Sequence, residues 1–193
     1  MNYMIILSQN LTNYDIPIPE NAVFRINLAW VNELDELKNL LEKHKNHSIF
    51  MDLPIGRTKP PNNSYSIDEL GELFKNYKNI KYFAISNVNN KEDLKQFKTK
   101  IPSNVNLIPK IESTDGVENI SSIVEELPTN EKIVMLDHDD LFTSILKQDL
   151  PISKFKEYFL KLVDFCEKNN VHLLRTVGVI FSDEEKKISQ YLK

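Results

Sequence analysis

The chain has 193 residues and a formal net charge of −4, enough length for one domain with a sizeable core. Because this charge is mild and the lysines are scattered, we expect no nucleic-acid partner. We also expect no membrane association or signal peptide, since no apolar run is long enough to cross a bilayer and Met1–Leu7 lacks a basic leader region. Cys166 is the only cysteine, which excludes an intrachain disulfide and favours a cytoplasmic location.

Strand-like and helix-like segments alternate along the chain and predict a parallel sheet covered by helices in one domain, residues 1–193. The predicted strands, short and apolar throughout, are Met4–Ser8, Val23–Leu28, Ser48–Leu53, Ile80–Ser86, Asn106–Glu112, Lys132–Leu136 and Val171–Val177. The predicted helices are Asn32–Lys45, Ser66–Asn76, Lys91–Thr99, Val117–Leu127, Leu141–Leu146, Ser153–Asn169 and Asp183–Leu192. Ser66 and Glu69 have the spacing of a capping box.

We interpret this alternation as an α/β fold of the TIM-type (β/α) barrel class. The chain offers about seven strands, whereas a closed barrel of this type takes eight. Either Gly178–Phe181 contributes a further strand or the barrel is incomplete and stays open. Because an exposed parallel edge invites unwanted pairing, we expect a helix or a second subunit to cover it, and a homodimer is the expected assembly.

Polar side chains recur where the predicted strands end. Lys110 and Glu112 are two residues apart, so both project from one face at the end of their strand, and Arg25 and Asn27 repeat this spacing. In a barrel of parallel strands the carboxyl end carries the chemistry. The other polar residues at strand ends are Asp52, Ser86, Asn87, Asp137, His138, Asp139, Asp140, Arg175 and Thr176.

Two interpretations of these charges stay open. Lys110 and Glu112 can hold a divalent metal and an anionic oxygen together, or they can form a plain ion pair at the end of a strand. The acids at Asp137, Asp139 and Asp140 add weight to a metal site, because clustered carboxylates select Mg²⁺ or Mn²⁺ over zinc. Alternatively, Asp139 or Asp140 caps the helix predicted to begin near Leu141.

The same motifs, in the same order, resemble the catalytic barrel of pyruvate kinase. The segments that carry the resemblance are Arg25–Asn27, Asp52–Thr58, Phe83–Val88, Lys110–Val117, Met135–Leu141 and Arg175–Val177. The resemblance implies that Glu112 and Asp140 hold the divalent metal, Mg²⁺ or Mn²⁺. It also implies that Asn27 and Asp52 bind the substrate, at positions that match the potassium site of that family.

Catalytic roles are implied by the resemblance as well. Lys110 would stabilise charge on a transferring phosphoryl group or an enolate oxygen. Arg25 would contact the substrate phosphate, and Thr176 would face the substrate methylene. The nucleotide-covering lid of that family follows its third strand, where this chain has only Lys59–Tyr65. Without a lid, ADP would be poorly positioned, so we expect no appreciable phosphoryl transfer.

Two functions therefore follow as expectations. The first is a barrel that binds a divalent metal and a small keto acid or enolate, such as pyruvate, oxaloacetate or phosphoenolpyruvate. Its chemistry would be that of a lyase or aldolase, which makes or breaks a carbon–carbon bond through an enolate and needs no nucleotide. The alternative is a catalytically inactive pyruvate kinase homologue that serves as a binding or assembly module.

Overall fold

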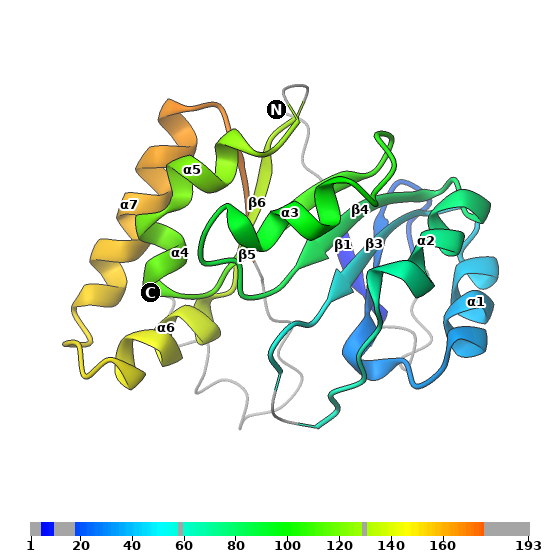
Figure 1. Ribbon diagram of the computed structural model, residues 1–193, viewed down its shortest axis with the longest axis horizontal. Coiled ribbons are helices and arrows are strands. Elements are labelled where there is room, and N and C mark those ends of the chain that lie inside the picture. Colours follow the sequence, from blue (N-terminus) through cyan, green and yellow to red (C-terminus); the bar gives the residue numbers. More distant parts are fainter. Residues whose placement is uncertain (1–4, 10–17, 58–59, 129–130, 176–193) are drawn as a thin grey trace.

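The computed structural model describes residues 5–9, 18–57, 60–128 and 131–175, which form one parallel sheet of seven strands in sequential order (Figure 1). The strands are β1 (Ile6–Ser8), β2 (Val23–Asn27), β3 (Ser48–Leu53), β4 (Ile80–Ile85), β5 (Asn106–Ile111), β6 (Ile133–Leu136) and β7 (His172–Arg175). Each predicted strand overlaps one of these. The parallel α/β architecture is therefore confirmed.

From β2 onward, helices form the connections that parallel neighbours require. They are α1 (Leu34–Lys43), α2 (Ile67–Asn76), α3 (Glu92–Lys98), α4 (Thr114–Glu118), α5 (Ile120–Glu125), α6 (His138–Lys147) and α7 (Lys154–Lys168), with a short 3-10 helix, η2 (Leu28–Trp30), after β2. The capping box predicted at Ser66 and Glu69 starts α2. Within the described ranges, no helix is both long and apolar enough to cross a membrane.

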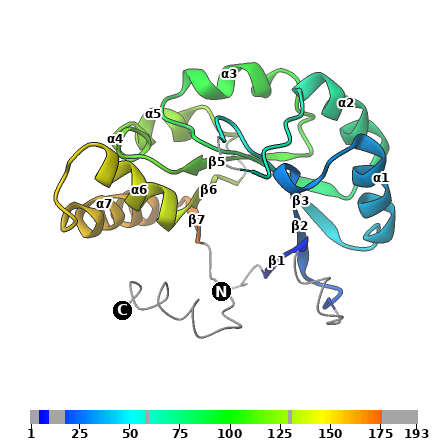
Figure 2. The same ribbon diagram turned by 90° about the horizontal axis from the view of Figure 1, so that it is seen from below.

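The expected TIM-type barrel is wrong, because the sheet curls strongly but stays open. β1 and β7 form its two edges, and no pairing joins them in the part of the chain that the structure describes. Figure 2 shows the sheet as an arch with the helices along its outer side. Closure of such a barrel needs a matched strand number, tilt and stagger, which the sequence pattern does not encode. The segments Gly178–Phe181 and Asp183–Leu192 lie outside the described residues.

Apolar side chains pack on both faces of the sheet. The larger cluster fills the space between the convex face and the helices and includes Phe24, Leu41 and Phe83. A smaller cluster lines the concave face and consists of Val23, Phe50, Ala84, Ile108, Ile133 and Met135. Since every second residue of a strand shares a face, the residues two positions later also lie on the concave side. These are the polar strand-end residues, so an apolar layer directly supports the polar end.

The helix predicted over Val117–Leu127 is in fact two helices, and the first begins earlier. Ser113 caps α4, its hydroxyl accepting a hydrogen bond from the Gly116 amide at 3.0 Å. Asn119 separates α4 from α5 with a non-helical backbone (φ −92°, ψ 9°). Its side-chain amide donates to the Asn89 carbonyl at 2.9 Å, which ties the break to the loop after β4. The apolar spacing continues through the break, so periodicity alone did not reveal it.

His44, at the C-terminal end of α1, is a buried histidine that packs on an aromatic ring. Its ring stacks on Phe24 with centroids 3.7 Å apart, and its Nε2 atom makes no hydrogen bond. Burial, followed by the neighbouring His47 and Lys43, lowers its pKa from 6.5 to about 4. The folded protein therefore holds this ring neutral at pH values where an unfolded chain would protonate it.

We expect the stability of the protein to fall by roughly 1–3 kcal/mol from this residue alone as the pH drops from about 6.5 to about 4. In that window the unfolded chain binds more protons at His44 than the folded chain does, so stability rises with pH. In His44→Leu, this part of the pH dependence should disappear. Urea unfolding at several pH values measures it, and His172→Gln, at an exposed position of β7, is the control. An unchanged pH dependence in His44→Leu would contradict the assignment.

Candidate functional site

A polar pocket of about 490 Å³ lies at the carboxyl end of the strands, next to α6. Its charged lining residues, among those described, are Arg25, Asp52, Arg57, Lys110, Glu112, Asp137, Asp140 and Lys147. Most of them follow the apolar concave layer along β2, β3, β5 and β6. The pocket therefore forms where parallel strands bring their carboxyl ends together.

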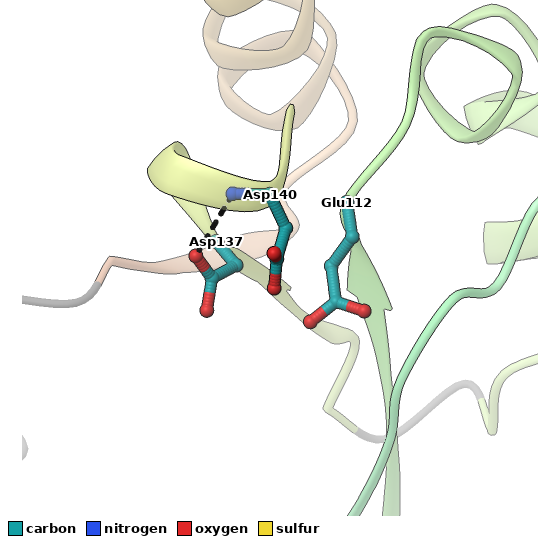
Figure 3. Close-up of side chains that lie close together, drawn as sticks. All are labelled: Glu112, Asp137 and Asp140. Atoms are coloured by element: carbon teal, nitrogen blue, oxygen red, sulfur yellow. Dashed lines mark hydrogen bonds between the residues drawn. The ribbon is translucent and has the colours of Figure 1, made fainter. Parts of the chain in front are cut away.

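Three carboxylates converge in this pocket. Glu112 follows β5, Asp137 follows β6, and Asp140 lies in the first turn of α6. One oxygen of each lies within 4.8 Å of the others, and Figure 3 shows the three side chains lying close together. The predicted convergence of Glu112 and Asp140 is thus observed, and Asp137 joins them.

The cap of α6 explains how Asp140 reaches the group. The expectation that Asp139 or Asp140 caps a helix near Leu141 is wrong, since α6 begins at His138 and Asp137 is its N-cap. The Asp137 carboxylate accepts a hydrogen bond from the Asp140 amide at 3.4 Å. Because Asp137 is the cap, Asp140 lies within the first turn of α6 and its carboxylate does not cap the helix. The Asp140 carboxylate therefore remains available beside Glu112.

Lys110 is a buried cation beside the three acids. Its Nζ lies 2.7 Å from a Glu112 oxygen and 3.5 Å from Oδ1 of Asp52, and it donates to the Ser86 hydroxyl at 3.2 Å. Burial alone would lower the pKa of Lys110, but Asp52 and Glu112 outweigh burial and raise it. Lys110 therefore stays charged near neutral pH and stabilises negative charge rather than acting as a neutral amine.

The surroundings of Glu112 and Asp140 disfavour the charged forms of these carboxyl groups. Burial raises the pKa of Glu112, against the lowering effects of Lys110 and of the Asn87 amide, which donates to Glu112 at 2.7 Å. Partial burial and the adjacent Asp137 raise the pKa of Asp140. A cation among the three carboxylates would relieve this repulsion. Since all three donors are oxygens, the group fits Mg²⁺ or Mn²⁺ better than zinc.

Arg25 and Asp52 form a second charged pair at the pocket wall. The Arg25 Nε donates to the Asp52 carboxylate at 3.1 Å, and a terminal guanidinium nitrogen contacts the same oxygen. Asp52 is only 1% exposed, and its other oxygen accepts no hydrogen bond. Asn27 also lines the pocket, where its side-chain oxygen accepts from the Ala29 amide. A potassium ion at Asn27 and Asp52 stays a prediction, and Asp52 already contacts two cationic side chains.

The last predicted site residue, Thr176, lies outside the described residues. Its neighbour Arg175 donates from Nε to Nε2 of His138 at 3.2 Å and lies 4.7 Å from the centre of the Phe159 ring. Burial, followed by Arg175, lowers the pKa of His138. His138 therefore accepts this hydrogen bond as a neutral ring, and the bond joins α6 to β7.

Apart from Asp140, the face of α6 that lines the pocket had not been predicted. Asp140, Thr143, Ser144 and Lys147 all line the pocket and follow the helical spacing i, i+3, i+4 and i+7. This polar stripe is visible in the sequence. It was missed because the helix was predicted to begin at Leu141, which left Asp140 outside it.

Comparison with known proteins gives the fold but not the function. No protein-family model matches the chain, and no curated protein matches it. It is similar to the crystal structure of RipC from Yersinia pestis, with a TM-score of 0.62 and 14% sequence identity over 98% of this chain and 81% of RipC. At this identity the similarity concerns the fold alone. The resemblance to pyruvate kinase rests on the sequence motifs.

Proposed function

We propose that this chain binds a divalent metal ion, Mg²⁺ or Mn²⁺, through Glu112 and Asp140, with Asp137 beside them. The same pocket would bind a small keto acid or enolate, such as pyruvate, oxaloacetate or phosphoenolpyruvate. The observation that supports this most directly is the convergence of three carboxylates, within 4.8 Å, next to the buried cation of Lys110.

The proposed chemistry is that of a lyase or aldolase. When bound, the metal would supply a Lewis acid next to a substrate oxygen. Lys110 would hold a fixed positive charge beside the same oxygen and lower the free energy of an enolate that forms there. Arg25, oriented by Asp52, would bind the substrate carboxylate or phosphate through its planar guanidinium. Cleavage or formation of a carbon–carbon bond through an enolate needs no nucleotide.

The connection between β3 and α2 supports a reaction without nucleotide. It runs from residue 54 to residue 66, too short for a lid domain. Asn63 donates to the Ala29 carbonyl at 3.0 Å, and the Tyr65 hydroxyl donates to the Val31 carbonyl at 2.7 Å. These contacts hold the connection against the segment after β2. We therefore do not propose phosphoryl transfer to ADP.

A second candidate is a non-catalytic binding or assembly module, in keeping with the sequence alternative. The ion pairs of Arg25 with Asp52 and Lys110 with Glu112 favour it, because they balance charges in the pocket without a ligand. The open edges at β1 and β7 would then serve a homodimer. Metal binding separates the two candidates, since only the first requires it.

Titration with Mn²⁺, followed through the electron paramagnetic resonance signal of the free ion, tests the proposal. We expect saturable binding to the wild type and at least about tenfold weaker binding to Glu112→Gln and Asp140→Asn, because each loses a charged ligand. Asp139→Asn is the matched control, since Asp139 neighbours Asp140 on α6 but is outside the three-carboxylate group. Absence of binding to the wild type, or equal loss in the control, would refute the metal site. Circular dichroism checks that each variant is folded.

A further inference from the structure

We infer that the ligand of this pocket is a dicarboxylate, whose second carboxylate binds Lys147 on α6. This inference rests on the proposed metal site and names its substrate class, a keto or hydroxy acid with two carboxylates rather than one. Three observations support it: the charge balance of the pocket, the position of Lys147 on α6, and the position of Lys110 at the strand ends.

The charges of the pocket favour a dianion. Among the described lining residues, four are cations and four are carboxylates, so their charges balance. A bound divalent metal would leave two positive charges without counterions. A monocarboxylate would neutralise one of them, whereas a dicarboxylate would neutralise both.

The cationic side chains of the pocket differ in the partners that they contact. Arg25 and Lys110 pair with Asp52 and Glu112 at the strand ends. Arg57 donates from Nε to the Pro61 carbonyl at 2.6 Å. No ion pair joins Lys147, in the last turn of α6, to any of the described residues. Lys147 is therefore the cation that is available for an anionic group of a ligand.

The position of Lys147 sets where that group would bind. Lys147 lies two helical turns after Asp140 on the same face of α6, about 10 Å along the axis. The flexible four-carbon stem of lysine can cover much of this distance. A ligand with one end at the metal ligand Asp140 would thus extend along α6, past Ser144, toward the ammonium group. A methyl group in place of the second carboxylate would leave that ammonium unpaired.

Lys110 sets the position of the other end of the ligand. Its Nζ lies 2.7 Å from a Glu112 oxygen and 3.5 Å from Oδ1 of Asp52, at the strand ends. A ligand oxygen at the proposed metal would bind beside this positive charge. The functional carbon of the ligand then lies near Lys110, and its second carboxylate lies away from it, toward α6.

Lactate and malate form a matched pair of probes, since they share a hydroxy-carboxylate end and differ only by a methyl group against a carboxymethyl group. With Mn²⁺ at saturation, calorimetry at pH 7 should show malate binding at least about tenfold tighter than lactate, equal to 1.4 kcal/mol. Lys147→Gln should remove this preference and leave lactate unaffected. Lys147→Arg should retain it, as should Lys156→Gln, a control on the exposed side of α7.

Malate that binds no tighter than lactate to the wild type would overturn the inference, as would equal loss of both ligands in Lys147→Gln. Phospholactate that binds tighter than malate without dependence on Lys147 would also overturn it and assign the pocket to a phosphate. In each of these cases Mn²⁺ binding would be intact and the proposed metal site would stand. Failure of Mn²⁺ to bind would instead refute the proposed function itself.

Discussion

Replacement of Lys110 by methionine is expected to lower the free energy of unfolding by about 3–5 kcal/mol at pH 7. Lys110 is 6% exposed and compensates Glu112 at 2.7 Å and Asp52 at 3.5 Å. Its removal leaves the buried Glu112 carboxylate without a cationic partner and Asp52 with Arg25 alone. The loss should shrink at pH 5. Glu112, whose pKa burial already raises, takes up a proton more readily once the lysine is gone.

Urea unfolding in the presence of EDTA measures this effect, because a bound metal ion would compensate the same charges. Lys98→Met is the matched control, since Lys98 also pairs with a glutamate, Glu126 at 2.9 Å, but at an exposed position. Its loss should stay below about 1 kcal/mol. The double variant Lys110→Met with Glu112→Gln should recover part of the stability. Equal losses at Lys110 and Lys98 would contradict the role of burial.

Replacement of Gly116 by alanine is expected to destabilise the protein by about 1–3 kcal/mol. A Cβ atom at Gly116 would lie 2.7 Å from the Val88 carbonyl oxygen and 3.3 Å from the Ile111 side chain. The first of these is a backbone atom in the segment after β4, which also carries the Asn87 amide bound to Glu112. The clash should therefore push α4 from the sheet and weaken Mn²⁺ binding as well.

Gly71→Ala is the matched control for Gly116→Ala. Gly71 lies inside α2, and a Cβ atom there would meet nothing within 4 Å. Alanine loses less backbone entropy than glycine in a helix, so this variant should gain about 0.5–1 kcal/mol. Thermal unfolding of both variants gives the comparison. A stabilised Gly116→Ala protein would show that α4 moves away freely and that the close approach has no energetic weight.

The sequence by itself determined the parallel α/β fold and much of the site. Short apolar segments alternating with helical patterns predicted all seven observed strands. The spacing of two residues placed Lys110 with Glu112, and Arg25 with Asn27, on one face at the carboxyl ends of their strands. Because parallel strands bring those ends to the same edge, side chains far apart in the sequence were predicted to meet. Local periodicity was sufficient for this, because strands that alternate with helices along the chain imply a parallel sheet.

Only the tertiary structure decided which of these groups contact one another and how far the sheet closes. The pairing of Arg25 with Asp52 depends on the register of β2 against β3, and the approach of Lys110 to Asp52, across β4, depends on the curl of the sheet. The approach of Asp137 and Asp140 to Glu112 depends on the pairing of β5 with β6, which brings the ends of these two strands together. The open edges at β1 and β7 depend on strand tilt and stagger. Each of these is a relation between distant segments, and the spacing of residues along one segment does not predict such relations.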